Sequence, residues 1–326
     1  MTTTPSGLER VPSPMPEPGV PEPAEQHGAS SRVGSAAHPP AAARRGDPAE
    51  RRREARLLAI LTMGLVALAS LPLMAPSAAL DWRAQWLVGI LVAIAAAFGA
   101  FQIFGEEEPR GVPIESMITP GLLSLAIYAA VPAAVWLGVH PAFALPVAVA
   151  IGLVLVRTAL DAEIPFVRLG GVTAAGDRRT VEALLLGAAF LCFIGVAATL
   201  PGGWPLPEIN HPGEPLVESV VAMGFADAVV AFFVGYRLTA LNGPISAVGW
   251  ASGTYAVLLG VAAVVFRWLA IPGLMGPALL AVVLYLRSIL RLRWAPPDRA
   301  ARWQLEAVVL GLVIVAVIVY QLLRRP

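Results

Sequence analysis

The stretch QWLVGILVAIAAAFGAFQIF, Gln85–Phe104, contains no charged residue over its whole length. An α-helix rises about 1.5 Å per residue, so roughly 20 apolar residues cross a hydrocarbon core about 30 Å thick. The stretch therefore predicts a transmembrane helix.

The composition of the whole chain has the same apolar character. Of its 326 residues 57% are hydrophobic and only 14% are charged, and the mean hydropathy is +0.72. Soluble domains usually carry about 25% charged residues. The tight turns VHPA and RWLAIPG separate two pairs of neighbouring apolar stretches, and misreading either turn would change the number of helices. The sequence predicts an all-α polytopic transmembrane helical bundle of about nine spans: Leu57–Ala75, Gln85–Phe104, Gly121–Val139, Ala142–Leu160, Glu182–Leu200, Leu216–Tyr236, Ala247–Trp268, Ile271–Leu290 and Gln304–Leu323.

Residues 1–50 are rich in Pro, Ala, Gly, Ser and Glu and hold almost no large apolar side chains. This composition predicts a disordered tail. Every basic residue of the chain is arginine, and most arginines lie in the tail or in segments on the same side of the membrane as the tail. Because cytoplasmic loops are enriched in arginine, this bias predicts an integral membrane protein with a cytoplasmic amino terminus. The exceptions are Arg83, Arg267, Arg324 and Arg325.

The prolines and glutamates that flank the predicted spans of the first half recur at similar positions in the second half. Pro113 recurs as Pro244, and Pro141 as Pro272, each 131 residues later. Glutamates precede the first, fifth and ninth predicted spans at Glu54, Glu182 and Glu306. An even number of spans preserves direction, so the pattern predicts two parallel four-span repeats, residues 51–160 and 177–291, and a terminal transmembrane helix, residues 302–324.

Enzymatic and metal motifs are weak. The segment WASGTYA around Ser252 resembles the serine stretch of rhomboid intramembrane proteases, but no histidine base follows His211. The acidic loop EEEPRG, residues 106–111, resembles the paired glutamates and arginine of CAAX-type membrane proteases, but the chain lacks the histidine-bearing helices that those enzymes need. In the outer loop Glu208, His211 and Glu214 form an insufficient set of ligands among several prolines. We therefore expect no catalytic residues, no metal site and no cofactor.

One carboxylate interrupts an apolar stretch, Asp227 in GFADAVVAFFVG, residues 224–235. It lies near the middle of the sixth predicted span, where a charged group costs roughly 2.5–3.5 kcal/mol on insertion scales. That cost favours the neutral, protonated acid. Gly224, Ala231 and Gly235 share its helical face, so Asp227 is expected to point into the bundle rather than at lipid.

The seventh predicted span offers Tyr255 at a similar depth, and the sequence predicts a hydrogen bond between Asp227 and Tyr255. In this structural interpretation, a neutral acid fastens two helices. In the functional interpretation, Asp227 is a protonation or ion site. With the repeat offset of 131, Ala96 is the position in the first repeat that corresponds to Asp227, so the acid departs from the repeated pattern.

The sequence favours a non-enzymatic membrane scaffold or assembly protein, with the tail and the cytoplasmic loops as contacts for other proteins. The alternative is a proton- or ion-coupled transporter of a small solute that uses Asp227. The lipid bilayer is the expected environment in both cases. The arginines follow a membrane-surface pattern, so no nucleic acid is expected as a partner.

Overall fold

The computed structural model describes residues 48–74, 81–105, 114–168, 175–200, 217–241, 248–269, 271, 273–291 and 297–324. All regular structure in these ranges is helical, without a strand. The described helices all belong to one unit, Arg45–Pro326. They are α1 (Pro48–Ser70), the 3-10 turn η2 (Leu71–Met74), α2 (Trp82–Gly105), α3 (Glu115–Trp136), α4 (Pro141–Arg168), α5 (Ala175–Thr199), α6 (Val217–Ala240), α7 (Val248–Trp268), α8 (Met275–Arg291) and α9 (Pro297–Arg324).

Each of the nine predicted apolar stretches coincides with one of these α-helices. Seven of the described helices, α1 to α7, are long and apolar enough to cross a membrane. Two further apolar segments, Met275–Leu290 and Val308–Tyr320, are shorter. The predicted class, a multi-pass helical membrane bundle, is supported at this level, whereas the count of nine spans stays a prediction.

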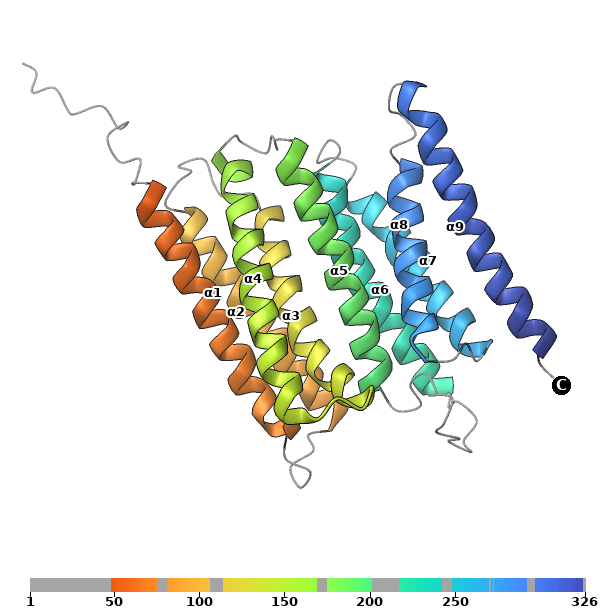
Figure 1. Ribbon diagram of the computed structural model, residues 1–326, viewed down its shortest axis with the longest axis horizontal. Coiled ribbons are helices and arrows are strands. Elements are labelled where there is room, and N and C mark those ends of the chain that lie inside the picture. Colours follow the sequence, from red (N-terminus) through yellow and green to blue (C-terminus); the bar gives the residue numbers. More distant parts are fainter. Residues whose placement is uncertain are drawn as a thin grey trace, which may run out of the picture. The chain divides into compact units, whose positions relative to one another are not determined.

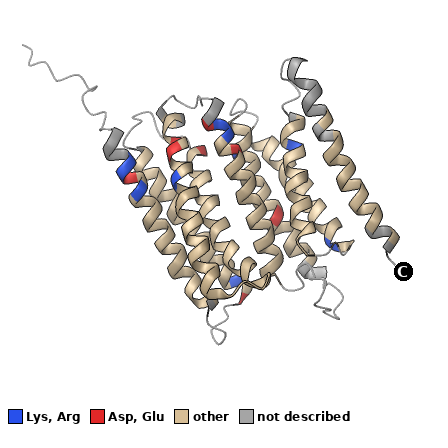
Figure 2. Ribbon diagram, in the orientation of Figure 1, with Lys and Arg blue, Asp and Glu red and all other residues tan. Residues whose placement is uncertain are grey.

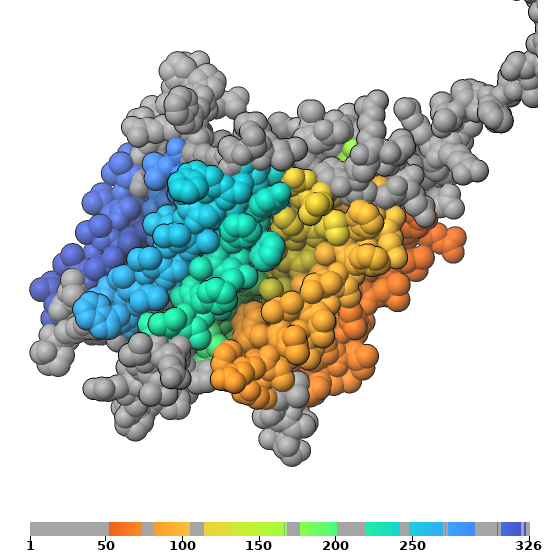
Figure 3. All heavy atoms as spheres, turned by 180° about the vertical axis from the view of Figure 1, so that it is seen from behind, coloured from red at the N-terminus to blue at the C-terminus, as the bar shows by residue number. Residues whose placement is uncertain are grey.

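The helices pack as two layers. One layer has the order α1, α4, α5, α8, α9, and the other has the order α2, α3, α6, α7, with each helix contacting the next in its layer. Figure 3 shows the second layer from behind, with α2, α3, α6 and α7 side by side. Contacts between the layers join α1 to α2, α3 to both α4 and α5, α5 to α6, and α7 to α8.

Both tight turns proposed from the sequence separate helices. After α3 ends, Gly138 adopts a φ of 86°, a conformation that favours glycine, and its amide donates to the Val135 carbonyl at 2.9 Å. Pro141 then begins α4, where its missing amide hydrogen costs nothing. Gly273, with a φ of 52°, lies in the corresponding turn between α7 and α8.

Helices α3 and α5 are the most buried of the candidate spans. They meet through small residues, because a methyl group placed on Gly195 would lie only 2.5 Å from the Ala129 Cβ. Small residues at such contacts let helix backbones approach closely in a membrane. Figure 2 shows that charged residues lie mostly toward the helix ends. The outward faces of the helices carry large apolar side chains, including Phe98, Phe143, Phe225 and Trp250.

Candidate functional site

Asp227 lies near the middle of α6 and is completely buried, with 0% of its surface exposed. Both carboxylate oxygens are buried, and neither has a hydrogen-bond partner among the described residues. It lies close enough to the Cys192 thiol of α5 to interact with it electrostatically. A buried polar atom without a partner is rare in native proteins and calls for an explanation. Asp227 is therefore enclosed but unsatisfied.

Small residues on α6 bring it against α7, as their spacing predicts. A methyl group on Gly224 would lie 3.1 Å from the Gly260 carbonyl oxygen, and one on Gly235 would lie 2.6 Å from the Tyr255 ring. Helices α6 and α7 make the most extensive contact of any helix pair in the described part of the chain. Close backbone packing, rather than a hydrogen bond from Asp227, thus joins these helices.

The predicted hydrogen bond between Asp227 and Tyr255 is wrong. Tyr255 packs on Gly235, which lies eight residues, or about 12 Å, along α6 from Asp227. The two helices run in opposite directions with Gly224 opposite Gly260, so the turn that carries Asp227 faces the Gly260 region of α7. The Tyr255 ring instead lies beneath Arg287 of α8, with the guanidinium carbon 5.4 Å from the ring centroid.

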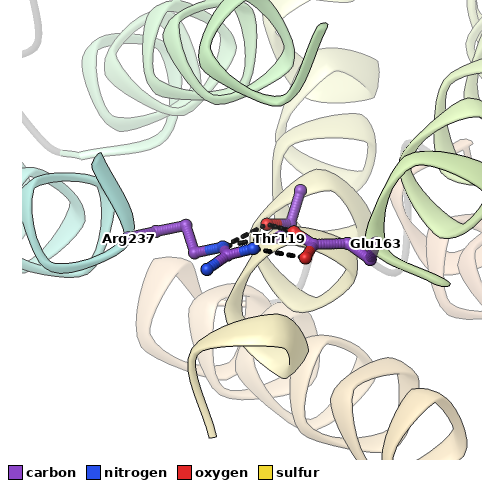
Figure 4. Close-up of polar contacts among 3 residues, drawn as sticks. All are labelled: Thr119, Glu163 and Arg237. Carbon is purple, nitrogen blue, oxygen red and sulfur yellow. Dashed lines mark hydrogen bonds and ion pairs between the residues drawn. The ribbon is translucent and has the colours of Figure 1, made fainter. Parts of the chain in front are cut away.

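A second buried site, absent from the sequence predictions, joins three helices at one end of the bundle (Figure 4). Its members are Thr119 of α3, Glu163 of α4 and Arg237 of α6, all 0% exposed, and we call them the charged cluster. The Arg237 Nε donates to Glu163 Oε1 at 3.2 Å, and its Nη2 donates to the other carboxylate oxygen. The Thr119 hydroxyl donates to Glu163 Oε1 at 2.6 Å.

The charged cluster pairs the carboxylate and the guanidinium that it buries. An isolated ion taken from water into a low-dielectric interior loses several kcal/mol, which only close pairing and additional hydrogen bonds offset. The two-pronged arginine–carboxylate contact and the threonine hydroxyl supply both. Next to the cluster, the buried Glu115 of α3 is hydrogen bonded to Tyr236 of α6.

The cluster was missed because helix ends were placed too early. The predicted fourth span stopped at Leu160 and the sixth at Tyr236, whereas α4 continues to Arg168 and α6 to Ala240. Glu163 and Arg237 therefore appeared to lie in loops. The sequence does contain an indication of the pair. A negatively charged and a positively charged residue lie just beyond two predicted spans that end on the same side of the membrane.

Several residues considered from the sequence lie outside the described residues: Glu106, Glu107, Arg110, Glu208, His211 and Glu214. The described residues include no group of three or more His, Cys, Asp or Glu side chains placed to hold a metal ion.

The comparisons with known proteins add no relative. Comparison with family models, with curated proteins and with solved structures found no match to this chain. The apolar helices and these sites define the class, a multi-pass helical membrane protein. Two acids of the described bundle are 0% exposed: Glu163, which is paired with Arg237, and Asp227, which has no hydrogen-bond partner.

Proposed function

We propose that this membrane protein couples the movement of a small solute to the binding and release of a proton at Asp227. The observation that carries the proposal is the lack of any hydrogen-bond partner at both carboxylate oxygens of a fully buried, mid-helix acid. An acid that fastened two helices would need such a bond. Ionisable groups inside membranes are costly and commonly mark proton or ion pathways.

The two-layer packing supports the parallel repeats that this function would use. The helix pairs α1·α2, α2·α3, α3·α4 and α1·α4 pack in the first four helices. Their counterparts α5·α6, α6·α7, α7·α8 and α5·α8 pack in the second four. Parallel repeats of this kind occur in transporters, where solute sites lie between the repeats near the bilayer midplane. Ala96 of α2, which corresponds to Asp227, is likewise buried, so the acid occupies an interior position of the repeat.

The orientation belongs to the proposal. Arg178 near the start of α5, and Arg237 and Arg287 near the ends of α6 and α8, lie on one side of the bundle, on which α1 begins. Arg83 and Arg267 lie at opposite helix ends. The inside-positive bias then places the start of α1 in the cytoplasm.

Proteoliposomes that contain a pH-sensitive dye test the coupling. We expect wild-type protein to move protons together with at least one member of a panel of ions and small solutes, and Asp227→Asn to abolish the proton movement. Asp161→Asn is the matched control, because Asp161 is an exposed acid in α4 with 45% of its side chain accessible. Proton-coupled flux that survives in Asp227→Asn would contradict the proposal.

A membrane scaffold or assembly protein is the second candidate. The enclosure of Asp227 favours it, because both carboxylate oxygens are buried within the described bundle. If the protein is a rigid scaffold, we expect no flux through wild-type protein for any member of the panel. We then also expect Asp227→Asn to bind the protein partners as the wild type does.

A further inference from the structure

The helices α1–α4 and the helices α5–α8 meet along one boundary. Helix α3 contacts α5 and α6 across this boundary, and α4 contacts α5. Between its two ends, the boundary is packed through small residues, as at Gly195 and Ala129.

The charged cluster closes one end of this boundary. Thr119 lies one turn after the start of α3, and Arg237 lies one turn before the end of α6. The cluster therefore ties α6 of the second set to α3 and α4 of the first set. Its bonds are charged and fully buried, so each is stronger than a bond between neutral groups.

A second polar contact closes the opposite end. The Trp86 indole Nε1, near the start of α2, donates to the Thr199 hydroxyl at the end of α5 over 2.8 Å. This contact also crosses the boundary between the two sets of helices. It is neutral and only partly buried, in contrast to the charged cluster.

Asp227 lies beside the boundary, between the two contacts. Thr199, Gly195 and Cys192 are spaced by four and three residues, so they line one face of α5. The first two face the first set of helices, at Trp86 and at Ala129. Cys192 continues this face toward the middle of the helix and lies within electrostatic range of Asp227.

We infer that the charged cluster and the Trp86–Thr199 contact are two latches whose alternate release opens the boundary to opposite sides of the membrane and admits water to Asp227. The inference rests on the proposed function. With both latches closed, Asp227 is sealed from both sides, as the structure has it. Opening the cluster exposes the boundary to the side where α1 begins, and opening the indole contact exposes it to the other side.

Cys192 reports directly on this opening, because it is the single cysteine of the chain and is fully buried within electrostatic range of Asp227. The full-length protein in proteoliposomes of known orientation is treated with a membrane-impermeant methanethiosulfonate, added outside or trapped inside. We expect Glu163→Gln to raise the labelling rate about tenfold or more from the side where α1 begins. Trp86→Phe should raise it from the opposite side by a smaller factor.

The controls separate opening from unfolding. Asp161→Asn changes an exposed acid on the same helix as Glu163 and should leave the rate unchanged, and Cys192→Ser should remove the label. Thr119→Val, which removes only one hydroxyl from the cluster, replaces Glu163→Gln if that variant does not fold. Labelling that rises equally from both sides, or that does not rise in folded latch variants, would overturn the inference.

The outcome also separates this inference from the proposed function. Sided labelling without proton-coupled flux would keep the two latches and overturn transport. Asp227-dependent flux without sided labelling would keep transport and overturn the latches.

Discussion

Asp227 and Glu163 are two buried acids of the same bundle, both 0% exposed, in opposite circumstances. Glu163 receives hydrogen bonds from Arg237 and Thr119, whereas neither oxygen of Asp227 has a partner in the described chain. Burial alone therefore does not define an acidic site. The hydrogen-bond partners of the acid decide its role. An acid with partners holds helices together, whereas an acid without partners is kept in the interior despite the free energy that its burial costs.

The difference also reverses the expected effect of mutation. Removing one member of a buried ion pair leaves the opposite charge buried without its counter-ion, which strongly destabilises a protein. Removing an acid that has no partner relieves an unfavourable burial. The two sites therefore predict changes of opposite sign in the free energy of unfolding.

The largest effect is expected at the charged cluster. Arg237→Leu should lower the free energy of unfolding by about 3–5 kcal/mol, because it leaves the Glu163 carboxylate buried without its counter-ion. The double variant Glu163→Leu/Arg237→Leu should lose less. Reversible unfolding in detergent measures both, and a double variant less stable than Arg237→Leu would show that the charge pairing is not the reason.

The contact between α6 and α7 should come second. Gly235→Ala places a methyl group 2.6 Å from the Tyr255 ring and should cost about 1–3 kcal/mol by overpacking. Gly253→Ala in α7 is the matched control, since nothing lies within 4 Å of its added methyl group. The same unfolding assay compares them, and equal stability would mean that α6 moves away from α7 at little cost.

The substitution Asp227→Thr should raise the free energy of unfolding by roughly 1–2 kcal/mol, because it removes an unsatisfied acid. A threonine hydroxyl in a helix can donate to the carbonyl four residues earlier, as Thr199 does to Gly195. Asp227→Asn should gain less, because the amide also needs partners. A less stable Asp227→Thr protein would contradict the absence of a partner and restore a fastening role for the acid.

The smallest effect is expected at the surface ion pair of Arg157 and Asp161, whose charged atoms lie 3.7 Å apart. Both side chains are nearly half exposed, so Asp161→Asn should change the stability by about 0–1 kcal/mol. Thermal unfolding at low and high salt measures this change. A larger loss would show that exposure does not weaken acidic contacts in this protein.

The positions of the helices were predictable from the sequence, because each long apolar stretch coincides with one helix. Such a stretch can be buried in the protein interior or in lipid. The enclosure of Asp227 followed from its small neighbours Gly224 and Gly235, which do pack against α7. Its partner was not predictable from depth alone. Depth counted from helix ends carries an error of several residues, and here that error placed Tyr255 opposite Asp227 instead of Gly235.

The charged cluster depends on contacts between residues far apart in the chain, with 74 positions separating Glu163 from Arg237. An arginine near a span end fits the inside-positive rule equally well whether it faces headgroups or an acid on another helix. Only the packing of α3, α4 and α6 distinguishes these cases.

The hydroxyl of Thr199 can act only as a hydrogen-bond acceptor toward neighbouring helices, although a hydroxyl can in general also donate. Its one hydrogen is used within α5, at 2.7 Å from the Gly195 carbonyl oxygen, so it offers its neighbours only lone pairs. A neighbouring helix can bond to it only with a donor, and the Trp86 indole, which has no acceptor, fits that requirement. The contact is thus directional, because the Trp86 indole can only donate and the Thr199 hydroxyl is left only to accept.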